Sequence, residues 1–182
     1  MTNNQVYYTN GGGDEQYTPA KTVEILLPYI QHLKGKTIWC PFDREDSQFV
    51  KVLIANGFKV VYSHLDYGQD FFEYEPEQWD VIISNPPYTN KRKYWERCLD
   101  LGKPFALLLP VNILSDSVIN VSLRERERET VALQLQLLIP SRRTRFYNAK
   151  TGEIGKSPTF KAAYFAINLF KEQIILTDLP KE

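Results

Sequence analysis

The sequence predicts an α/β domain with a doubly wound sheet that is mostly parallel and carries a C-terminal antiparallel hairpin. Three observations predict this fold class. Short apolar runs that suit buried strands alternate with amphipathic helical segments between residues 37 and 109. The run from Phe105 to Leu109 is apolar throughout, as expected of a strand in a parallel sheet that is covered on both faces. Towards the C-terminus, two strand patterns follow each other and indicate a hairpin.

The composition predicts one globular domain. The chain has 182 residues, of which 43% are hydrophobic and 24% are charged, enough for one full core and little more. Residues 1–16 are polar and contain Gly11-Gly12-Gly13, which predicts a flexible N-terminal arm. Residues 17–182 are therefore expected to form a single domain.

The first elements are a helix and a short strand. Thr18 is a suitable N-cap and Pro19 a suitable first helical residue, and apolar residues then recur at helical spacing as far as Leu33. Pro28 should kink this helix, and Gly35 should end it. The next run, Thr37-Ile38-Trp39-Cys40, predicts a buried strand that Pro41 stops.

Alternation of helices and strands continues through the middle of the chain. A helix is predicted from Ser47 to Asn56 because Phe49, Val50, Leu53 and Ile54 share one face and Asn56-Gly57 is a stop signal. The elements expected after it are a strand at 59–63, a strand at 80–84, a helix capped by Thr89 or Asn90 and ended by Gly102, and a strand at 105–109.

The last third predicts one more helix and two strands. The run from Arg124 to Glu129 alternates in charge, so its opposite charges pair at i,i+3 and indicate a solvated helix face. Beyond it, Val131 to Ile139 alternates between apolar and polar residues as a strand does, and Phe160 to Phe170 is an aromatic-rich strand.

Charge and cysteine content narrow the class of protein. Lys plus Arg number 22 and Asp plus Glu also 22, so any nucleic-acid contact must come from a local basic patch. Cys40 and Cys98 form no CxxC pattern and only two histidines are present, so no metal site is expected and a reduced, cytoplasmic setting fits best. No apolar run approaches the roughly 20 residues of a membrane span, and no membrane association is expected.

The tetrapeptide Asn85-Pro86-Pro87-Tyr88 directly follows the predicted strand at 80–84, where α/β enzymes place their chemistry. Asn85 Oδ1 and a proline carbonyl can accept the two N–H bonds of a planar amine, while Tyr88 stacks on the attached ring. The prolines fix φ and add no competing N–H, so the loop is pre-organised for amine methylation. The alternative is a plain turn, because Asn-Pro is a common turn signal.

On these motifs the chain resembles class I, Rossmann-like, S-adenosylmethionine-dependent methyltransferases of the N6-adenine type. The family signature after its fourth strand is Asn-Pro-Pro-Tyr or a close variant, which Asn85-Pro86-Pro87-Tyr88 matches in full. Tyr17-Thr18-Pro19 resembles the family's N-terminal cofactor motif, and Asp70-Phe71 resembles its acidic-aromatic pair on the third strand. The resemblance covers nearly the whole chain and implies methyl transfer from S-adenosyl-L-methionine to the N6 amine of adenine in DNA.

The first-strand motif departs from the family norm, which is an acidic residue, a proline and a glycine-rich turn. Here the turn reads Cys40-Pro41-Phe42-Asp43 without glycine. It is similar to that of the EcoRI-type adenine methylases, which use a Cys-Pro turn with an Asp beneath it. The resemblance places Asp43 near the methionine ammonium of the cofactor, with backbone donors of the helix near Ser47 facing its carboxylate. The alternatives are a decayed site or an Asp43 that caps the helix.

Other cofactor contacts follow from the same resemblance. Tyr17 would face the sulfonium in a cation–π contact, or pack as a hydrophobic staple. Asp66 is the acid nearest to the place of the ribose hydroxyls. Asp70 would bond the cofactor's adenine amine and Phe71 would pack on its ring, although Phe71 also suits an ordinary core position.

Adenine in a duplex must be flipped out to be methylated, and its stacking calls for a second aromatic wall. The resemblance implies Phe160, at the end of Ser157-Pro158-Thr159-Phe160, with Phe146 as a reserve; alternatively, Phe160 anchors the hairpin. The residues expected to clamp DNA phosphates, unless they are merely solvated, are Arg142, Arg143 and Arg145.

The chain length leaves open how a target would be recognised. Relatives of this group usually carry a separate target-recognition domain, so the resemblance implies a minimal form that has low selectivity, or that relies on a partner subunit or a homodimer. One alternative function is a catalytically inactive, methyltransferase-like protein that binds nucleic acid or inhibits a partner. The other is an RNA adenine or protein glutamine N-methyltransferase, since these enzymes share the tetrapeptide.

Overall fold

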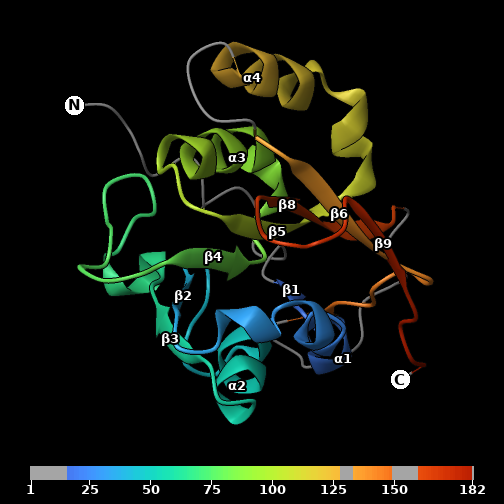
Figure 1. The fold of residues 1–182 in the computed structure, drawn as a ribbon. Helices are drawn as coiled ribbons and strands as arrows, with labels where there is room; N and C mark the ends of the chain where they lie inside the picture. The colour runs from blue at the N-terminus through green and yellow to red at the C-terminus, as the bar shows by residue number, and fades with distance from the viewer. Residues whose placement is uncertain (1–15, 128–132, 149–159, 182) are drawn as a thin grey trace.

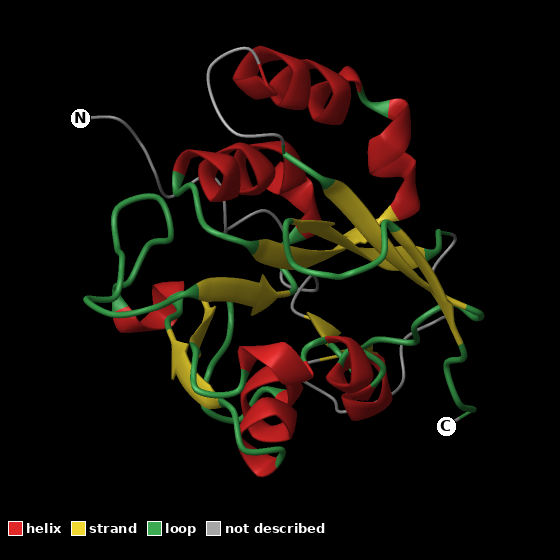
Figure 2. Cartoon of the chain, viewed as in Figure 1, coloured by secondary structure: helices red, strands yellow, loops and turns green. Residues whose placement is uncertain are grey.

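Seven strands of the described residues form one central sheet with helices on both faces (Figures 1 and 2). The computed structural model of the protein describes residues 16–127, 133–148 and 160–181. The strands follow the order β3-β2-β4-β5-β8-β6-β9, and neighbours are parallel except that β8 is antiparallel to both β5 and β6. The predicted fold class, a mostly parallel doubly wound sheet with a C-terminal antiparallel hairpin, is confirmed.

The strand bounds agree closely with the sequence prediction in the first half of the chain. The central sheet consists of β2 (Thr37–Cys40), β3 (Lys59–Tyr62), β4 (Val81–Ser84), β5 (Phe105–Pro110), β6 (Leu135–Pro140), β8 (Ala162–Ile167) and β9 (Ile174–Thr177). The sequence did not predict β9, which adds a parallel edge strand beside β6. It also did not predict a small antiparallel sheet of β1 (Gln16–Tyr17) and β7 (Tyr147–Asn148), which pairs Tyr17 with Tyr147.

Four α-helices connect these strands: α1 (Ala20–Glu24), α2 (Gln48–Ala55), α3 (Lys91–Asp100) and α4 (Ser117–Glu127), among the described residues. Short 3₁₀ turns lie at η2 (Leu27–Tyr29), η3 (Gln31–Leu33), η4 (Leu65–Tyr67), η5 (Tyr88–Asn90) and η6 (Val111–Ser115). The predicted helix after Ser47 is confirmed, and Ser47 Oγ caps it by accepting from Val50 N at 3.2 Å. Within the described parts of the chain, every helix is too short or too polar to cross a membrane.

The single kinked helix predicted after Thr18 is wrong. Its place is taken by the five residues of α1 and by the turns η2 and η3. Pro28 lacks an N–H, and in a continued α-helix its ring would collide with the carbonyl of Glu24, so the chain forms a 3₁₀ turn there instead of a kinked helix. Thr18 is not the cap, because Pro19 holds that position. The apolar pattern still reports burial correctly, as Val23 and Leu26 are fully buried.

The structure has no strand between residues 63 and 80, so Asp70-Phe71, which resembles a pair that the family carries on its third strand, lies in the connection between β3 and β4. Asp70 begins a turn instead: its Oδ1 accepts from Phe72 N at 3.0 Å and its carbonyl accepts from Tyr74 N at 2.7 Å. A short aspartate side chain that bonds the backbone two residues on favours a turn over an extended ladder. The chain therefore passes from β3 to β4 through η4 and this turn.

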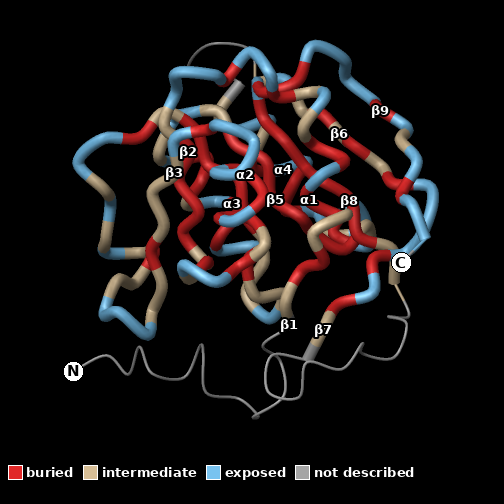
Figure 3. The backbone as a smooth tube through the Cα atoms, turned by 90° about the horizontal axis from the view of Figure 1, so that it is seen from below, coloured by how far each residue is buried: buried red, intermediate tan, exposed pale blue. Residues whose placement is uncertain are grey.

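Each face of the sheet has its own hydrophobic cluster. One cluster packs under α1 and α2 and includes Phe49 and Tyr164, and the other packs under α3 and α4 and includes Trp39 and Trp95. Buried segments accordingly run through the centre of the molecule, with exposed ones around them (Figure 3). Because β2 and β4 are adjacent and parallel, their carboxyl ends meet at one edge of the sheet.

Candidate active site

A buried hydrogen bond joins the two chain segments that leave β2 and β4. Asp43 follows β2, Ser84 is the last residue of β4, and the Ser84 hydroxyl donates to Asp43 Oδ2. Ser84 immediately precedes Asn85 in the tetrapeptide. The structure thus brings the predicted cofactor turn and the predicted amine-binding loop together, although they are about 40 residues apart along the chain.

The Asp43 carboxyl is deeply buried, with 7% of the residue exposed. Burial raises its pKa from the usual 3.8 to about 6, and hydrogen bonds from the Ser84 and Ser47 side chains partly oppose that shift. Asp43 is not the helix cap that the sequence allowed, because Ser47 caps α2. A carboxyl of this kind gains most from a cationic group placed beside it.

In the side-chain amide of Asn85, the nitrogen has a hydrogen-bond partner and the oxygen has none among the described residues. Its Nδ2 donates to Thr18 Oγ1 at 3.1 Å, which ties the predicted N-terminal cofactor motif to the tetrapeptide. Its Oδ1 is buried and has no hydrogen-bond partner among the described residues. The bond to Thr18 sets the orientation of the amide, with the oxygen directed away from that contact. A buried acceptor without a donor costs about 1–3 kcal/mol, so this oxygen is poised for a ligand N–H.

Tyr88 lies in an aromatic cluster with both of the predicted wall residues. Its ring centroid is 5.5 Å from that of Phe160, at 71°, and 6.1 Å from that of Phe146, at 84°. Both contacts are edge to face, whereas a base held between two rings needs them parallel and roughly 7 Å apart, two van der Waals layers. A base can therefore stack on Tyr88 only after the Phe160 ring moves or over a face that it leaves open. The segment 157–159 lies outside the described residues.

Burial also affects the protonation of the Tyr88 hydroxyl and the Cys40 thiol. It raises the pKa of the Tyr88 hydroxyl well above its usual range, so the hydroxyl stays protonated. Burial, helped by the neighbouring Asp43 charge, likewise raises the pKa of the Cys40 thiol. Cys40 and Pro41 are both buried at the end of β2, and a protonated thiol there acts as packing and not as a nucleophile.

Arg44 connects two residues that the sequence assigned to the cofactor. One guanidinium nitrogen donates to Asp66 Oδ2 at 2.7 Å, and the other bonds the Tyr17 hydroxyl. The guanidinium carbon lies 5.6 Å from the centroid of the Tyr17 ring. Arg44 therefore takes the cation–π position on Tyr17 that the resemblance gave to the sulfonium. The sequence offered no signal for Arg44, because its partners are 22 and 27 positions away.

Phe71 belongs to the hydrophobic cluster on the other face of the sheet from Tyr88. Phe71 is 1% exposed, and its ring centroid lies 5.4 Å from that of Trp39 and 4.9 Å from that of Phe42. This burial favours the core interpretation of Phe71. Contact of Asp70 or Phe71 with the cofactor's adenine remains a prediction.

The three predicted phosphate-binding arginines are exposed and lie together. They form part of a cleft of about 540 Å³, which we call the basic cleft, whose lining residues are Pro19, Lys21, Thr22, Arg142, Arg143, Arg145, Leu179, Pro180 and Lys181. Pro19 adjoins Thr18, which bonds Asn85, so this cleft borders the candidate active site.

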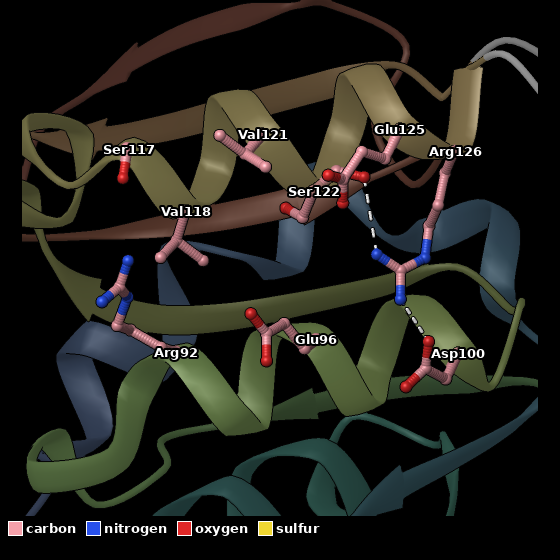
Figure 4. A pocket seen from close by; sticks show the side chains of 9 residues that line it. All are labelled: Arg92, Glu96, Asp100, Ser117, Val118, Val121, Ser122, Glu125 and Arg126. Atoms are coloured by element: carbon pink, nitrogen blue, oxygen red, sulfur yellow. Dashed lines mark hydrogen bonds and ion pairs between the residues drawn. The ribbon is translucent and has the colours of Figure 1, made fainter.

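A second cleft, of about 330 Å³, lies between α3 and α4 on the opposite face of the sheet (Figure 4). Its lining mixes both signs of charge, and Arg126 pairs across it with Asp100. The predicted solvated helix face is confirmed at Arg124 and Glu125, which are exposed, whereas Arg126 bonds Asp100 of α3. Residues 128 and 129 of that run lie outside the described residues.

Comparison with known proteins supports the fold. No family model and no curated protein matches the sequence. Among solved structures, a Listeria monocytogenes protein described as a class I S-adenosylmethionine-dependent methyltransferase superposes with a TM-score of 0.50 at 13% identity, over 92% of this chain and 67% of its own. The chain has the class I methyltransferase fold.

Two further solved structures match this chain at lower TM-scores. A type I restriction-modification methyltransferase subunit from Streptococcus thermophilus has a TM-score of 0.44 at 12% identity, and covers 93% of this chain. A Thermoplasma acidophilum protein described as a methyltransferase has a TM-score of 0.38 at 16% identity, covering 88% of this chain and 68% of its own. This chain spans 48% of the Streptococcus subunit, about half of its length.

Proposed function

We propose that this chain transfers a methyl group from S-adenosyl-L-methionine to the exocyclic N6 amine of adenine in DNA. The observation that carries the proposal is the buried Asn85 Oδ1, which has no partner among the described residues while its Nδ2 is held by Thr18. An amide fixed by one end and open at the other is suited to accept one N–H of a planar amine. The backbone carbonyl of Pro86 is the expected acceptor for the second N–H.

The residues at the end of β2 fit the cofactor. When bound, S-adenosylmethionine supplies an electrophilic methyl group on a positively charged sulfur. Asp43 offers its ammonium a buried carboxylate, and the start of α2 lies near it, because the side chain of the cap residue Ser47 hydrogen-bonds Asp43. The missing glycine creates no strain, because Asn168 is the only non-glycine residue with positive φ among the described residues, so the turn after Cys40 has ordinary backbone angles.

The neighbouring residues would hold the amine and the base in place. Asn85 and the Pro86 carbonyl would orient the amine, and accepting both N–H bonds leaves the nitrogen lone pair free to point at the methyl donor. Pro86 and Pro87 keep the loop rigid, and the Tyr88 ring offers a stacking surface for the base. The amine needs no early general base, which agrees with a Tyr88 hydroxyl that stays protonated.

DNA is the substrate class that the surroundings favour, because the basic cleft borders the amine site and can hold a phosphate backbone. Target recognition by a partner subunit or by a homodimer is part of this proposal. The position of Arg44 on Tyr17 favours a second candidate, a nucleic-acid-binding protein of the same fold that does not methylate. RNA adenine and protein glutamine are the other amine substrates to compare.

Calorimetry with S-adenosylmethionine and S-adenosylhomocysteine tests the proposal first. At least one of them should bind at micromolar concentration, the range in which enzymes commonly work. Transfer of a labelled methyl group to DNA, RNA and protein pools then separates the substrate classes, with DNA expected to carry the label. Failure of both cofactors to bind, alone or with DNA, would leave the non-methylating candidate.

Replacing Arg44 tests how its contacts affect the cofactor. Arg44→Ala should bind S-adenosylmethionine about tenfold more tightly, since it removes a like charge near the sulfonium and frees Tyr17 and Asp66, about 1.4 kcal/mol in all. The neutral S-adenosylhomocysteine should gain less. Titration of both ligands against the wild type measures this, with Arg92→Ala, an exposed arginine on α3, as the matched control. Weaker binding by Arg44→Ala would show that Arg44 supports the cofactor site.

A further inference from the structure

The basic cleft concentrates positive charge on a protein with no net charge. Three segments far apart in sequence form it: α1, the loop after β6 and the segment after β9. Five cationic residues line it, and none of its described lining residues is acidic. Its ligand should therefore be an anion with several charges.

Two contacts join the segments that form the cleft, one of them buried and the other exposed. The Thr144 side chain is 1% exposed and its hydroxyl lies 3.4 Å from that of Thr22, which joins the arginine loop to α1. On the other side, the Lys21 ammonium donates to the backbone carbonyl of Lys181. The cationic side chains therefore project from a fixed frame, and this makes the cleft a preformed site.

The same loop reaches the amine site. Arg143 and Arg145 line the cleft, while the residues that alternate with them, Thr144 and Phe146, are buried. Phe146 contacts the Tyr88 ring with 6.1 Å between centroids. Pro19 continues the connection on the opposite wall, since Thr18 accepts a hydrogen bond from Asn85. A ligand in the cleft would thus lie next to the residues that would hold the flipped base.

We propose that the basic cleft binds the phosphodiester backbone of single-stranded DNA beside the target nucleotide. Lys21 and Lys181 join the three arginines in this role. A volume of about 540 Å³ is that of a small-molecule pocket, which accommodates a few backbone groups of one strand. The identity of the target base rests on the proposed function, whereas binding of the strand in the cleft does not.

Fluorescence anisotropy with a labelled single-stranded oligonucleotide, without cofactor, tests this site. If all five cations contact phosphates, the logarithm of the association constant should fall with the logarithm of salt concentration with a slope of about −3.5. Two double variants each remove two of these cations: Lys21→Ala with Lys181→Ala, and Arg142→Ala with Arg145→Ala. Each double variant should reduce the magnitude of that slope by about 1.4 and weaken binding. Lys51→Ala with Lys59→Ala, two exposed lysines on α2 and β3, should change neither quantity.

The outcomes separate the cleft from the methylation proposal. Strand binding that needs both walls, with no binding of S-adenosylmethionine, supports the cleft and rejects methyl transfer. The proposal that the cleft binds the strand is overturned if the cleft variants bind it as the wild type does, or if the wild type does not bind it. This holds even if methyl transfer occurs. Dependence on the arginines alone also overturns the proposal, because only one wall would then contact the ligand. Equal unfolding temperatures of all variants exclude misfolding as the cause.

Discussion

Asn85→Ala is expected to lower methyl transfer by about a thousandfold or more while leaving S-adenosylmethionine affinity within about twofold of the wild type. The substitution removes the acceptor that is proposed to hold the amine, and loss of one pre-organised polar contact to a reacting group commonly costs two to three orders of magnitude. Asn85 has no expected contact with the cofactor, so the effect should fall on kcat. Single-turnover transfer of a labelled methyl group and calorimetry on the same samples measure the two quantities.

The stability of this variant should change little. Asn85→Ala loses the bond to Thr18, worth about 1 kcal/mol, but also removes a buried oxygen without a partner, which had a cost of similar size. Asn90→Ala is the matched control, because Asn90 lies five positions on in the same loop and its side chain makes no capping bond. If Asn85→Ala lost cofactor affinity together with transfer, the amine-holding role assigned to Asn85 would be wrong.

Local patterns predicted the strands better than the helices. The strand Thr37–Cys40 has the predicted bounds, and β4 and β5 differ from prediction by one residue at one end. A short apolar run bounded by turn residues leaves few alternative registers. The prediction of one helix after Thr18 is wrong because a proline such as Pro28 can either kink a helix or end it. Which of the two occurs depends on tertiary packing, and the spacing of apolar residues carries no information about that.

The candidate site shows the same division between local and long-range information. The tetrapeptide and Asp43 are recognisable because their chemistry is written in consecutive residues, and a parallel sheet then places them at one edge. The bond from Ser84 to Asp43 and the contacts of Arg44 span 22 to 41 positions and have no sequence signature. The contribution of Lys21 and Lys181 to the basic cleft has no sequence signature either, since only folding brings them to the arginine loop.

The glycine-free turn also has a different meaning once it is seen in the fold. From sequence, the missing glycine suggests a decayed cofactor site. In the structure the turn adopts ordinary backbone angles and directs Asp43 into a buried network with Ser84 and Ser47. A glycine-free turn lets the backbone approach a cofactor less closely, but a buried carboxylate beside the start of a helix can bind the cofactor's ammonium by its charge. Asp43 is therefore the residue whose titration should report on the cofactor site.

The stability of the protein should fall as pH rises from about 4 to above 6, by up to about 3 kcal/mol through Asp43 alone. The pKa of Asp43 is raised from 3.8 to about 6 in the folded state, so between these values the folded state binds more protons than the unfolded state. The stabilising contribution is full below pH 3.8 and is lost as pH rises through about 6. Urea denaturation of the wild type and of Asp43→Asn, which cannot titrate, isolates the effect as their difference.

Another carboxyl should not interfere in that window. The pKa of Asp80 is lowered, chiefly by the Thr37 backbone N–H, so its contribution changes only at and below its usual pH range. A difference between the wild type and Asp43→Asn that is flat from pH 4 to 7 would contradict the burial of an ionisable Asp43.

The same titration connects Asp43 to the cofactor. An ammonium placed beside the carboxylate lowers the pKa of Asp43, so binding of S-adenosylmethionine at pH 6 should release about half a proton from it. Calorimetry in buffers of different ionisation enthalpy counts that proton, and Asp43→Asn should release about half a proton less. Equal proton release by both proteins, with binding intact, would place the ammonium away from Asp43 and leave the end of β2 without its proposed role.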